Sequence, residues 1–235
     1  MIDLHSHILP EVDDGSESVE ETLTLLSMLR EQGIETVAAT PHFYADQDSL
    51  DSFLERRDAA CERLRGLLPD DAPKIIAGAE VRYYEGISRM ADLKKLTLGG
   101  GKLLLLEMPF AKWTDYTRRE IIDIACRGDI TLVLAHIERY MSKDNLKIIE
   151  GFYGSDVLMQ VNASFFLESR SKRRALKLLR EGKVQLLGSD CHNITHRPPR
   201  IGEAYELIQN KLGEEFVGEM NGFAMHLLKK SATLF

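Results

Sequence analysis

Two histidines separated by one residue, His5 and His7, follow a short apolar run at the start of the chain. If residues 2–4 form a strand, side chains alternate between its two faces, so both imidazoles project to the same side. Imidazole is the commonest metal ligand in proteins, and two that converge form half of a coordination shell. Taken alone, the pair is equally consistent with a tag remnant or with two solvated histidines. The rest of the chain must decide between these interpretations.

Further potential metal ligands stand where later apolar runs end. Six such runs follow the first, at residues 36–40, 74–80, 102–108, 131–136, 157–162 and 185–189. The side chains at or just beyond their ends are His42, Glu80, Glu107, His136, Asn162, Asp190 and His192. Any one of them alone is more simply a core or capping residue. As a set they indicate a metal cluster, because buried carboxylates beside imidazoles are costly unless a cation or hydrogen bond compensates them.

The elements that must position these side chains alternate between strand and helix. The apolar runs are continuous, as expected of strands buried on both faces. A helix is expected from Ser18, with Glu21 three residues later as in a capping box, to Gly33. Other helices are expected at 50–67, 116–127, 143–150, 172–181, 203–212 and 214–230. This alternation predicts an α/β fold of parallel strands, and in a parallel barrel the carboxyl ends of all strands share one face.

Length and composition indicate one domain spanning residues 1–235. A chain of this length with 44% hydrophobic residues can bury roughly 70–75% of its unfolded surface in one core. No apolar run approaches the roughly 20 residues that cross a bilayer, and no signal peptide is evident, so we expect a cytoplasmic protein without membrane insertion. Three widely spaced cysteines suit a reducing compartment. The net charge of −7 disfavours binding to a nucleic acid.

The loop after the first strand contains Asp13 and Asp14, which either cap the helix near Ser18 or return toward the metal site. Mixed histidine and carboxylate ligands suit Mn, Fe or Zn, and ligand softness alone does not distinguish them. Nine candidate ligands exceed what one ion needs. Two or three metals that share bridging carboxylates fit better, and such clusters orient substrate oxygens and provide a hydroxide at neutral pH.

In sequence order, these motifs resemble those of the PHP (polymerase and histidinol phosphatase) superfamily, and more narrowly the bacterial protein-tyrosine phosphatases of capsule and exopolysaccharide operons. The resemblance covers essentially the whole chain. The motifs are Asp3-Leu4-His5-Ser6-His7-Ile8-Leu9-Pro10, Asp13-Asp14-Gly15, Thr40-Pro41-His42, Gly78-Ala79-Glu80, Leu106-Glu107-Met108-Pro109, His136-Ile137-Glu138-Arg139-Tyr140, Gln160-Val161-Asn162 and Ser189-Asp190-Cys191-His192. That family usually has proline where Ile137 stands and commonly glycine where Glu11 stands.

The resemblance implies a distorted seven-stranded parallel (β/α) barrel of the PHP type with a trinuclear metal site. The implied ligands are His5, His7, Glu80 and Asp190 for the first metal, Glu80 as a bridge with Glu107 and His136 for the second, and Asp14, His42 and His192 for the third. Two or three divalent ions are expected, manganese first, with iron or zinc as alternatives. Arg139 and Arg197 match the family's phosphate-binding residues, a role that suits bidentate guanidinium groups. The alternatives are a surface helix start for Arg139 and a loop charge for Arg197.

The implied activity is metal-dependent hydrolysis of phosphotyrosine on proteins, by in-line attack of hydroxide with tyrosinate as the leaving group. The implied partner is the phosphorylated, tyrosine-rich tail of a bacterial autophosphorylating tyrosine kinase that controls polysaccharide export. A phosphatase for histidinol phosphate or another small phosphoester, a nuclease, and a non-catalytic binding module of the same fold are the alternatives.

A cysteine-dependent mechanism is the chemical alternative, because Cys191 and Arg197 with five residues between them match the loop of cysteine-based tyrosine phosphatases. That chemistry needs a thiolate of lowered pKa, cradled by backbone N–H groups. Here Asp190 adjoins the cysteine, no intervening residue is glycine, and Pro198 follows. We therefore expect a raised thiol pKa and a Cys191 side chain that points away from the site.

Basic and aromatic residues near the expected strand ends complete the set of candidates. The basic run at residues 170–174 could attract an acidic phosphorylated tail, or could be a solvated helix start. Phe43, Tyr44, Phe110 and Trp113 could line a pocket for a phenyl ring, or could pack beneath the loops.

Overall fold

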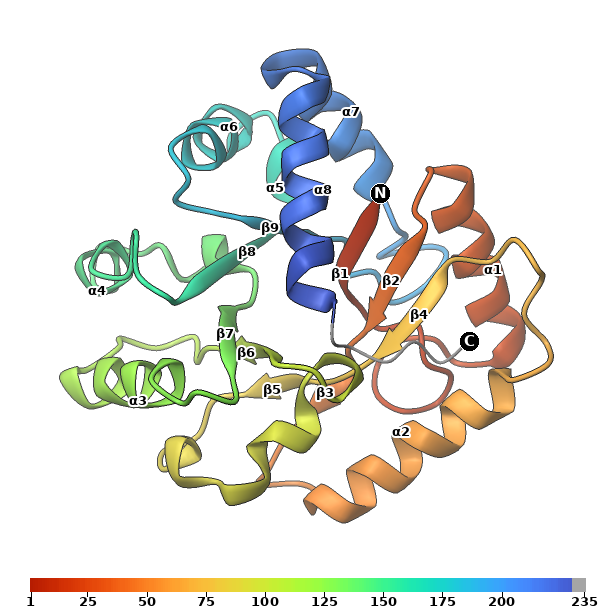
Figure 1. The fold of residues 1–235 in the computed structure, drawn as a ribbon, viewed down its shortest axis with the longest axis horizontal. Helices are drawn as coiled ribbons and strands as arrows, with labels where there is room; N and C mark the ends of the chain where they lie inside the picture. Colours follow the sequence, from red (N-terminus) through yellow and green to blue (C-terminus); the bar gives the residue numbers. More distant parts are fainter. Residues whose placement is uncertain (230–235) are drawn as a thin grey trace.

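A computed structural model describes residues 1–229 and shows parallel strands enclosed by helices (Figure 1). The strands form a sheet of order β1-β2-β4 and a second sheet of order β3-β5-β6-β7-β8-β9. They are β1 (Ile2–Ser6), β2 (Thr36–Ala39), β3 (His42–Phe43), β4 (Lys74–Ala77), β5 (Glu80–Arg82), β6 (Leu103–Glu107), β7 (Thr131–Leu134), β8 (Leu158–Asn162) and β9 (Leu186–Gly188). The α/β class and the parallel pairing expected from the sequence are confirmed.

Two of the expected strands are each followed by a second, short strand. The run at 36–40 gives β2, and β3 lies just beyond its expected end; the run at 74–80 gives β4 and includes only the first residue of β5. β2 and β4 pair with each other in the first sheet, whereas β3 and β5 pair in the second. Pro41, between β2 and β3, lacks the N–H that a continuous ladder uses. Gly78, between β4 and β5, is closely packed, since a Cβ there would lie 2.3 Å from the Leu98 side chain.

The first and last strands of the chain lie side by side at their carboxyl ends. The N–H of Asp190 donates to the carbonyl oxygen of His5 over 2.8 Å, and the N–H of His7 donates to that of Cys191 over 2.8 Å. A parallel bridge between Ser6 and Cys191 continues this pairing. Residues from both ends of the sequence are therefore brought together beyond β1 and β9.

The helices cover the outside of the strands (Figure 1). They are α1 (Val19–Glu31), α2 (Leu50–Leu64), α3 (Asp115–Ala125), α4 (Leu146–Glu150), α5 (Ala163–Leu167), α6 (Lys172–Arg180), α7 (Ile201–Leu212) and α8 (Glu214–Leu228), with 3-10 turns η1 (Ile87–Arg89), η2 (Ala91–Leu96), η3 (Leu98–Gly100) and η4 (Ile137–Tyr140). Every expected helix is present, although α2 ends at Leu64 rather than Leu67 and α4 begins at Leu146 rather than Lys143. α5 and the 3-10 turns are too short to show helical periodicity. The expected end of the last helix at Lys230 lies outside the described residues.

α1 begins at the predicted residue but without a reciprocal capping box. The Ser18 hydroxyl accepts a hydrogen bond from the N–H of Glu21 over 3.2 Å. The Glu21 carboxylate, however, accepts from the N–H of Glu17 over 2.9 Å and from that of Ile194 over 3.3 Å. Glu21 thereby ties the start of α1 to the loop that follows β9.

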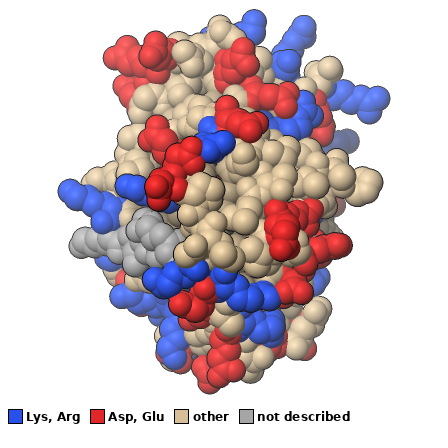
Figure 2. Space-filling model, turned by 90° about the vertical axis from the view of Figure 1, so that its right-hand side faces the viewer, with Lys and Arg blue, Asp and Glu red and all other residues tan. Residues whose placement is uncertain are grey.

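The strands are buried on both faces. β1 and β6 are buried at every position, and β6 is accordingly a continuous apolar run up to Glu107. β1 instead alternates, and the side chains of Asp3 and His5 are buried polar groups between apolar residues. A smaller part of the core packs Leu4, Val133 and Leu186 with Ala224 and Leu228 of α8. No helix within residues 1–229 is long and apolar enough to cross a membrane. Figure 2 shows acidic and basic side chains interspersed on the face that includes α1 and α2.

Candidate metal centre

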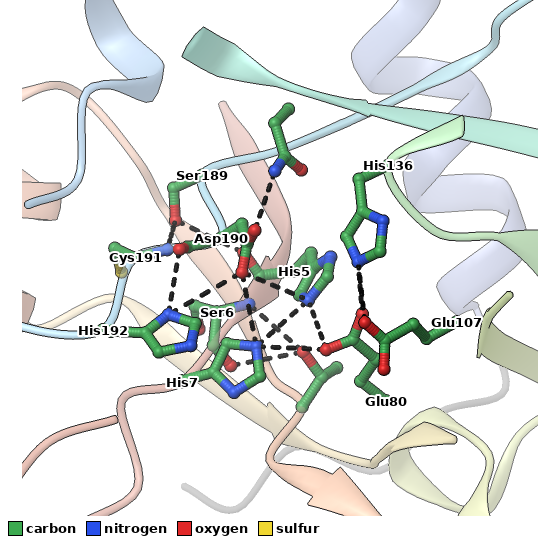
Figure 3. A network of polar contacts seen from close by, with 12 residues as sticks. His5, Ser6, His7, Glu80, Glu107, His136, Ser189, Asp190, Cys191 and His192 are labelled. Carbon is green, nitrogen blue, oxygen red and sulfur yellow. Dashed lines mark hydrogen bonds and ion pairs between the residues drawn. The ribbon is translucent and has the colours of Figure 1, made fainter. Parts of the chain in front are cut away.

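The predicted ligands lie together at the carboxyl ends of the strands, and Figure 3 shows most of them. Within the described chain, potential ligand atoms lie within 4.8 Å of one another in three groups: His7, Asp14, His42 and His192; His5, His7 and Asp190; and His42, Glu80 and Glu107. The groups share His7 and His42, so they form one continuous cluster. His136 adjoins it, with Nε2 2.7 Å from Oε1 of Glu80 and 3.8 Å from Oε1 of Glu107.

His5 and His7 converge as their spacing predicts. Their Nε2 atoms are 3.1 Å apart. Oε2 of Glu80 lies 3.2 Å from Nε2 of His5 and 3.3 Å from Nε2 of His7, and Oδ1 of Asp190 lies 3.7 Å and 3.4 Å from the same two atoms. All four side chains are buried, so the two histidines are neither a tag remnant nor solvated.

Hydrogen bonds at the opposite ring nitrogen orient two of the histidines. Nδ1 of His7 lies 2.6 Å from Oδ2 of Asp13, and Nδ1 of His192 lies 3.0 Å from the carbonyl oxygen of Asp190. Both partners only accept hydrogen bonds, so Nδ1 of each ring carries a proton, and in the neutral form of either ring the lone pair is on Nε2. Metal-binding histidines are typically held in this way by an acceptor on the far side of the ring.

Gln160 and Asn162 on β8 position several of the candidate ligands. Oε1 of Gln160 accepts from the N–H of His136 over 2.7 Å and lies 3.3 Å from Nδ1 of His5. Nε2 of Gln160 donates to Asn162, which in turn donates from Nδ2 to Asp190 over 2.7 Å. Asn162 therefore binds a candidate ligand through its amide. The role of Gln160 was not predicted, although its spacing of two from Asn162 places both side chains on one face of the strand.

Asp14 lies at the open side of the cluster. Its Oδ1 is 3.6 Å from Nε2 of His42 and 3.5 Å from Nε2 of His192, and its side chain is 68% exposed. The neighbouring His192 ring is the largest influence on the carboxyl, and it lowers the pKa of Asp14. Neither aspartate of the loop caps α1, because Ser18 does so. Asp13 is instead buried against His7.

Unpaired buried atoms fit the binding of cations at this cluster. Oε2 of Glu80, Nδ1 of His42 and Nε2 of His192 are buried and form no hydrogen bond of good geometry, although Oε2 of Glu80 lies 3.0 Å from Nδ1 of His42. Buried polar groups without such a bond are rare in native proteins. Three of them within one cluster of imidazoles and carboxylates are the donor set expected of a site for divalent metals.

Burial and neighbouring charges together set the pKa values of the ionisable groups of the cluster. Burial favours the neutral form of His7, yet the neighbouring Asp13 carboxylate outweighs it and raises the pKa of His7 well above its usual value. Burial also opposes ionisation of Glu80, but the surrounding histidines, His5 foremost, lower its pKa well below the usual range. For Glu107, burial and the Glu80 charge both raise the pKa. Metal binding would therefore displace protons from this cluster.

Two candidate ligands occupy left-handed backbone conformations. φ is 29° at His136 and 54° at Asp190. Non-glycine residues adopt this region at a cost of roughly 1–2 kcal/mol, and such strain concentrates at functional sites. Among the described residues, one other non-glycine residue has a positive φ, Glu11 at 60°. The tyrosine phosphatases that the sequence resembles commonly have glycine at this position.

Arg139 and Arg197 both contact the carboxylate of Asp190. Nη2 of Arg139 donates to Oδ2 of Asp190 in a short contact, and Nη2 of Arg197 lies 2.8 Å from Oδ1. Both arginines line a cavity of about 210 Å³ that also includes Ser164 and Arg200. Neither is a purely surface charge, because both contact a buried candidate ligand. The basic run at 170–174 lies at the start of α6, where no acidic residue occupies the first turn.

Cys191 is buried and directed away from the cluster. Burial foremost, followed by the Asp3 charge, raises the pKa of its thiol to about 12. Figure 3 shows its sulfur on the far side of the chain from the ring of His192 and the carboxylate of Asp190. A thiol that is neutral at physiological pH and out of reach of the cluster cannot serve as the nucleophile.

Comparisons with known proteins agree with this geometry. Residues 1–226 match the family described as capsular polysaccharide synthesis, CpsB/CapC. Tyrosine-protein phosphatase CpsB of Streptococcus agalactiae serotype III is 32% identical over 237 residues, which cover 94% of each chain. Tyrosine-protein phosphatase YwqE of Bacillus subtilis is 27% identical over 245 residues, covering 100% of this chain and 94% of YwqE.

A solved structure is also similar over nearly the whole chain. It comes from crystal structures of YwqE from Bacillus subtilis and CpsB from Streptococcus pneumoniae, described as unique metal-dependent tyrosine phosphatases. The TM-score is 0.84 at 25% identity, and the similarity covers 99% of this chain and 96% of the other.

Proposed function

The chain belongs to the CpsB/CapC family of capsular polysaccharide synthesis proteins, and from that membership we propose that it hydrolyses phosphotyrosine on proteins with bound divalent metals. One observation carries the proposal. A buried cluster of imidazoles and carboxylates adjoins two arginines in a chain whose relatives are named tyrosine-protein phosphatases. The metals and the arginines supply the two things that phosphoryl transfer requires, a nucleophile and stabilisation of charge.

The proposed fold is the distorted seven-stranded barrel of the PHP type, in one domain over residues 1–235. Counting β2 with β3 and β4 with β5 as single strands gives seven. The contact between β1 and the segment after β9 supports closure at the carboxyl ends of the strands. Closure at this end is what brings His5 and Asp190 together.

The proposed cofactor is a set of two or three divalent metals, manganese first, with iron or zinc as alternatives. The assigned ligands are His5, His7, Glu80 and Asp190 for one position, Glu80, Glu107 and His136 for the next, and Asp14, His42 and His192 for the third. The short distances among these side chains and the orphaned atoms of Glu80, His42 and His192 support the assignment. When bound, the metals supply a hydroxide nucleophile and neutralise charge.

Arg139 and Arg197 are proposed to bind the substrate phosphate. Both are one third to two fifths exposed and are held by the buried carboxylate of Asp190, so their guanidinium groups are oriented before substrate arrives. Bidentate hydrogen bonds from arginine stabilise the charge that develops on the equatorial oxygens. Tyrosinate leaves readily because the pKa of tyrosine is about 10, so a strong proton donor is not required.

The proposed partner is the phosphorylated, tyrosine-rich tail of a bacterial tyrosine kinase that controls capsule or exopolysaccharide synthesis, and the proposed location is the cytoplasm. The family description and the names of the relatives support this partner. The tail would present its phosphate at the open side of the cluster, beside Asp14 and the two arginines.

The decisive experiment measures metal content and hydrolysis in the same sample. Wild-type protein should contain two or three equivalents of metal and should hydrolyse a phosphotyrosine peptide in preference to histidinol phosphate. Arg139→Ala and Arg197→Ala should each reduce kcat/KM by about 100-fold or more while metal content is retained. Preference for histidinol phosphate would reassign the substrate, and hydrolysis without metal would overturn the proposal.

A further inference from the structure

Phe110 is the most exposed large apolar side chain in the described part of the protein. It lies three residues after the candidate ligand Glu107, and 73% of it is exposed. Of the three other residues considered for a phenyl pocket, Phe43 and Trp113 are 1% and 2% exposed and belong to the core, whereas Tyr44 is half-buried. Phe110 is therefore the one of the four whose ring is largely exposed.

Buried rings connect Phe110 to the metal centre. Its ring centroid lies 5.2 Å from that of Tyr140, with the planes tilted by 46°. Tyr140 in turn lies 5.6 Å from the ring of His136 and 5.6 Å from that of Trp113. These separations are those at which aromatic rings attract one another. Tyr140 and Trp113 are buried, so the Phe110 ring packs against an aromatic side chain that is held in place. Tyr140 also contacts the candidate ligand His136.

Other side chains at the rim are less suited to receive an aromatic ring. Tyr44 stacks on His42 at 5.0 Å, and the guanidinium of Arg82 lies 5.3 Å from the centre of the Tyr44 ring. Ile194, after His192, is 42% exposed but is aliphatic. Phe110 thus offers an exposed aromatic surface near the cluster.

We propose that Phe110 is a specificity-determining residue that contacts the phenyl ring of the substrate while the phosphate occupies the metal centre. The inference rests on the proposed phosphatase function and extends it to the recognition of aryl rather than alkyl phosphates. β6, which carries Glu107 and leads to Phe110, is separated from β3 by β5 alone, so these strands are about 10 Å apart. An aromatic ring entering between the loops that follow β3 and β6 would meet Phe110 on one side.

The test compares a ligand that has a ring with one that lacks it. In Phe110→Ala, KM for phenyl phosphate should rise about tenfold, whereas the inhibition constant of inorganic phosphate should change less than twofold. Phe110→Tyr should restore the wild-type KM, and Phe110→Leu should give an intermediate value. Phe223→Ala removes another exposed phenylalanine, on α8, and serves as the matched control with no effect on either constant.

Results that would overturn the role of Phe110 can be distinguished from results that would overturn the phosphatase function. An equal rise in both constants would mean that Phe110 acts on His136 through Tyr140, which overturns the inference. An unchanged KM would overturn it as well. Both results leave the phosphatase function standing, because wild-type hydrolysis of phenyl phosphate is measured first. If the metal-loaded wild-type protein hydrolysed no phosphoester, the proposed function would be wrong, and the role proposed for Phe110 would be wrong with it.

Discussion

Oδ2 of Asp13 lies 2.6 Å from Nδ1 of His7 and accepts a hydrogen bond from the N–H of His42 over 2.9 Å. One buried carboxylate therefore positions two candidate ligands from different strands. His7 follows β1 and His42 begins β3, so Asp13 joins the end of the first sheet to the start of the second. Its hydrogen bond fixes the His7 tautomer that presents Nε2 to the cluster.

Replacing Asp13 should weaken metal binding without removing a ligand. We expect Asp13→Ala to lower metal affinity about 10- to 100-fold, the usual effect of losing such an orienting partner. Titration of activity with Mn²⁺ measures this, and the rate at saturating metal should fall much less. Asp13→Asn keeps an acceptor oxygen and should show a smaller loss. An unchanged titration midpoint would mean that Asp13 serves only the loop.

Replacing either histidine of the first strand should abolish metal-dependent hydrolysis. His5→Ala and His7→Ala each remove an atom that faces Glu80 and Asp190, so activity should fall by more than about 100-fold. The apolar core is untouched, so the circular dichroism spectrum should stay that of the wild type. His226→Ala on α8, away from the centre, is the control. Retention of activity in both variants would exclude the assigned first metal position.

Chelation and substitution of Cys191 should have opposite effects on activity. A chelator should eliminate hydrolysis, and added Mn²⁺ should restore it. Cys191→Ala should retain most activity, because burial keeps the thiol neutral and the side chain points away from the cluster. A chelator-resistant activity that the substitution abolishes would favour the cysteine mechanism instead.

Glu138 should make the stability of the metal-free protein depend on pH. Burial of its carboxylate is the main cause that raises the pKa of Glu138 to about 7. Below pH 4.5, the pKa of this carboxyl in the unfolded state, Glu138 is protonated in both states, and the folded protein has its full stability. The free energy of unfolding then falls as pH rises through about 7, because ionisation is easier in the unfolded state.

Glu138→Gln removes this titration but can still accept the hydrogen bond from the N–H of Asn162. We expect the variant to be more stable than the wild type at pH 8 by roughly 3 kcal/mol, a difference that vanishes near pH 4.5. Chemical denaturation of both metal-free proteins across this range is the measurement. A difference independent of pH would show that Glu138 is not the titrating group.

Much of the fold was predictable because strand and helix periodicities are local properties of the sequence. The continuous apolar runs became buried parallel strands, and Ser18 starts α1 as its side chain suggested. The division of β2 from β3 at Pro41 was not predicted, since it depends on a change of sheet that composition does not reveal. The reciprocal capping box failed because Glu21 found partners at Glu17 and Ile194, one of them distant in sequence.

By itself the sequence determined which side chains could bind metal and that strand ends would hold them, because alternation along a strand and parallel pairing follow from local backbone geometry. Only the tertiary structure decided how they are oriented. The Asp13 contact with His7, the Gln160 link from His5 to His136, and the exposure of Phe110 all join or separate residues that lie on different elements. Hydrogen bonds and burial of this kind depend on packing between strands, which no local pattern encodes.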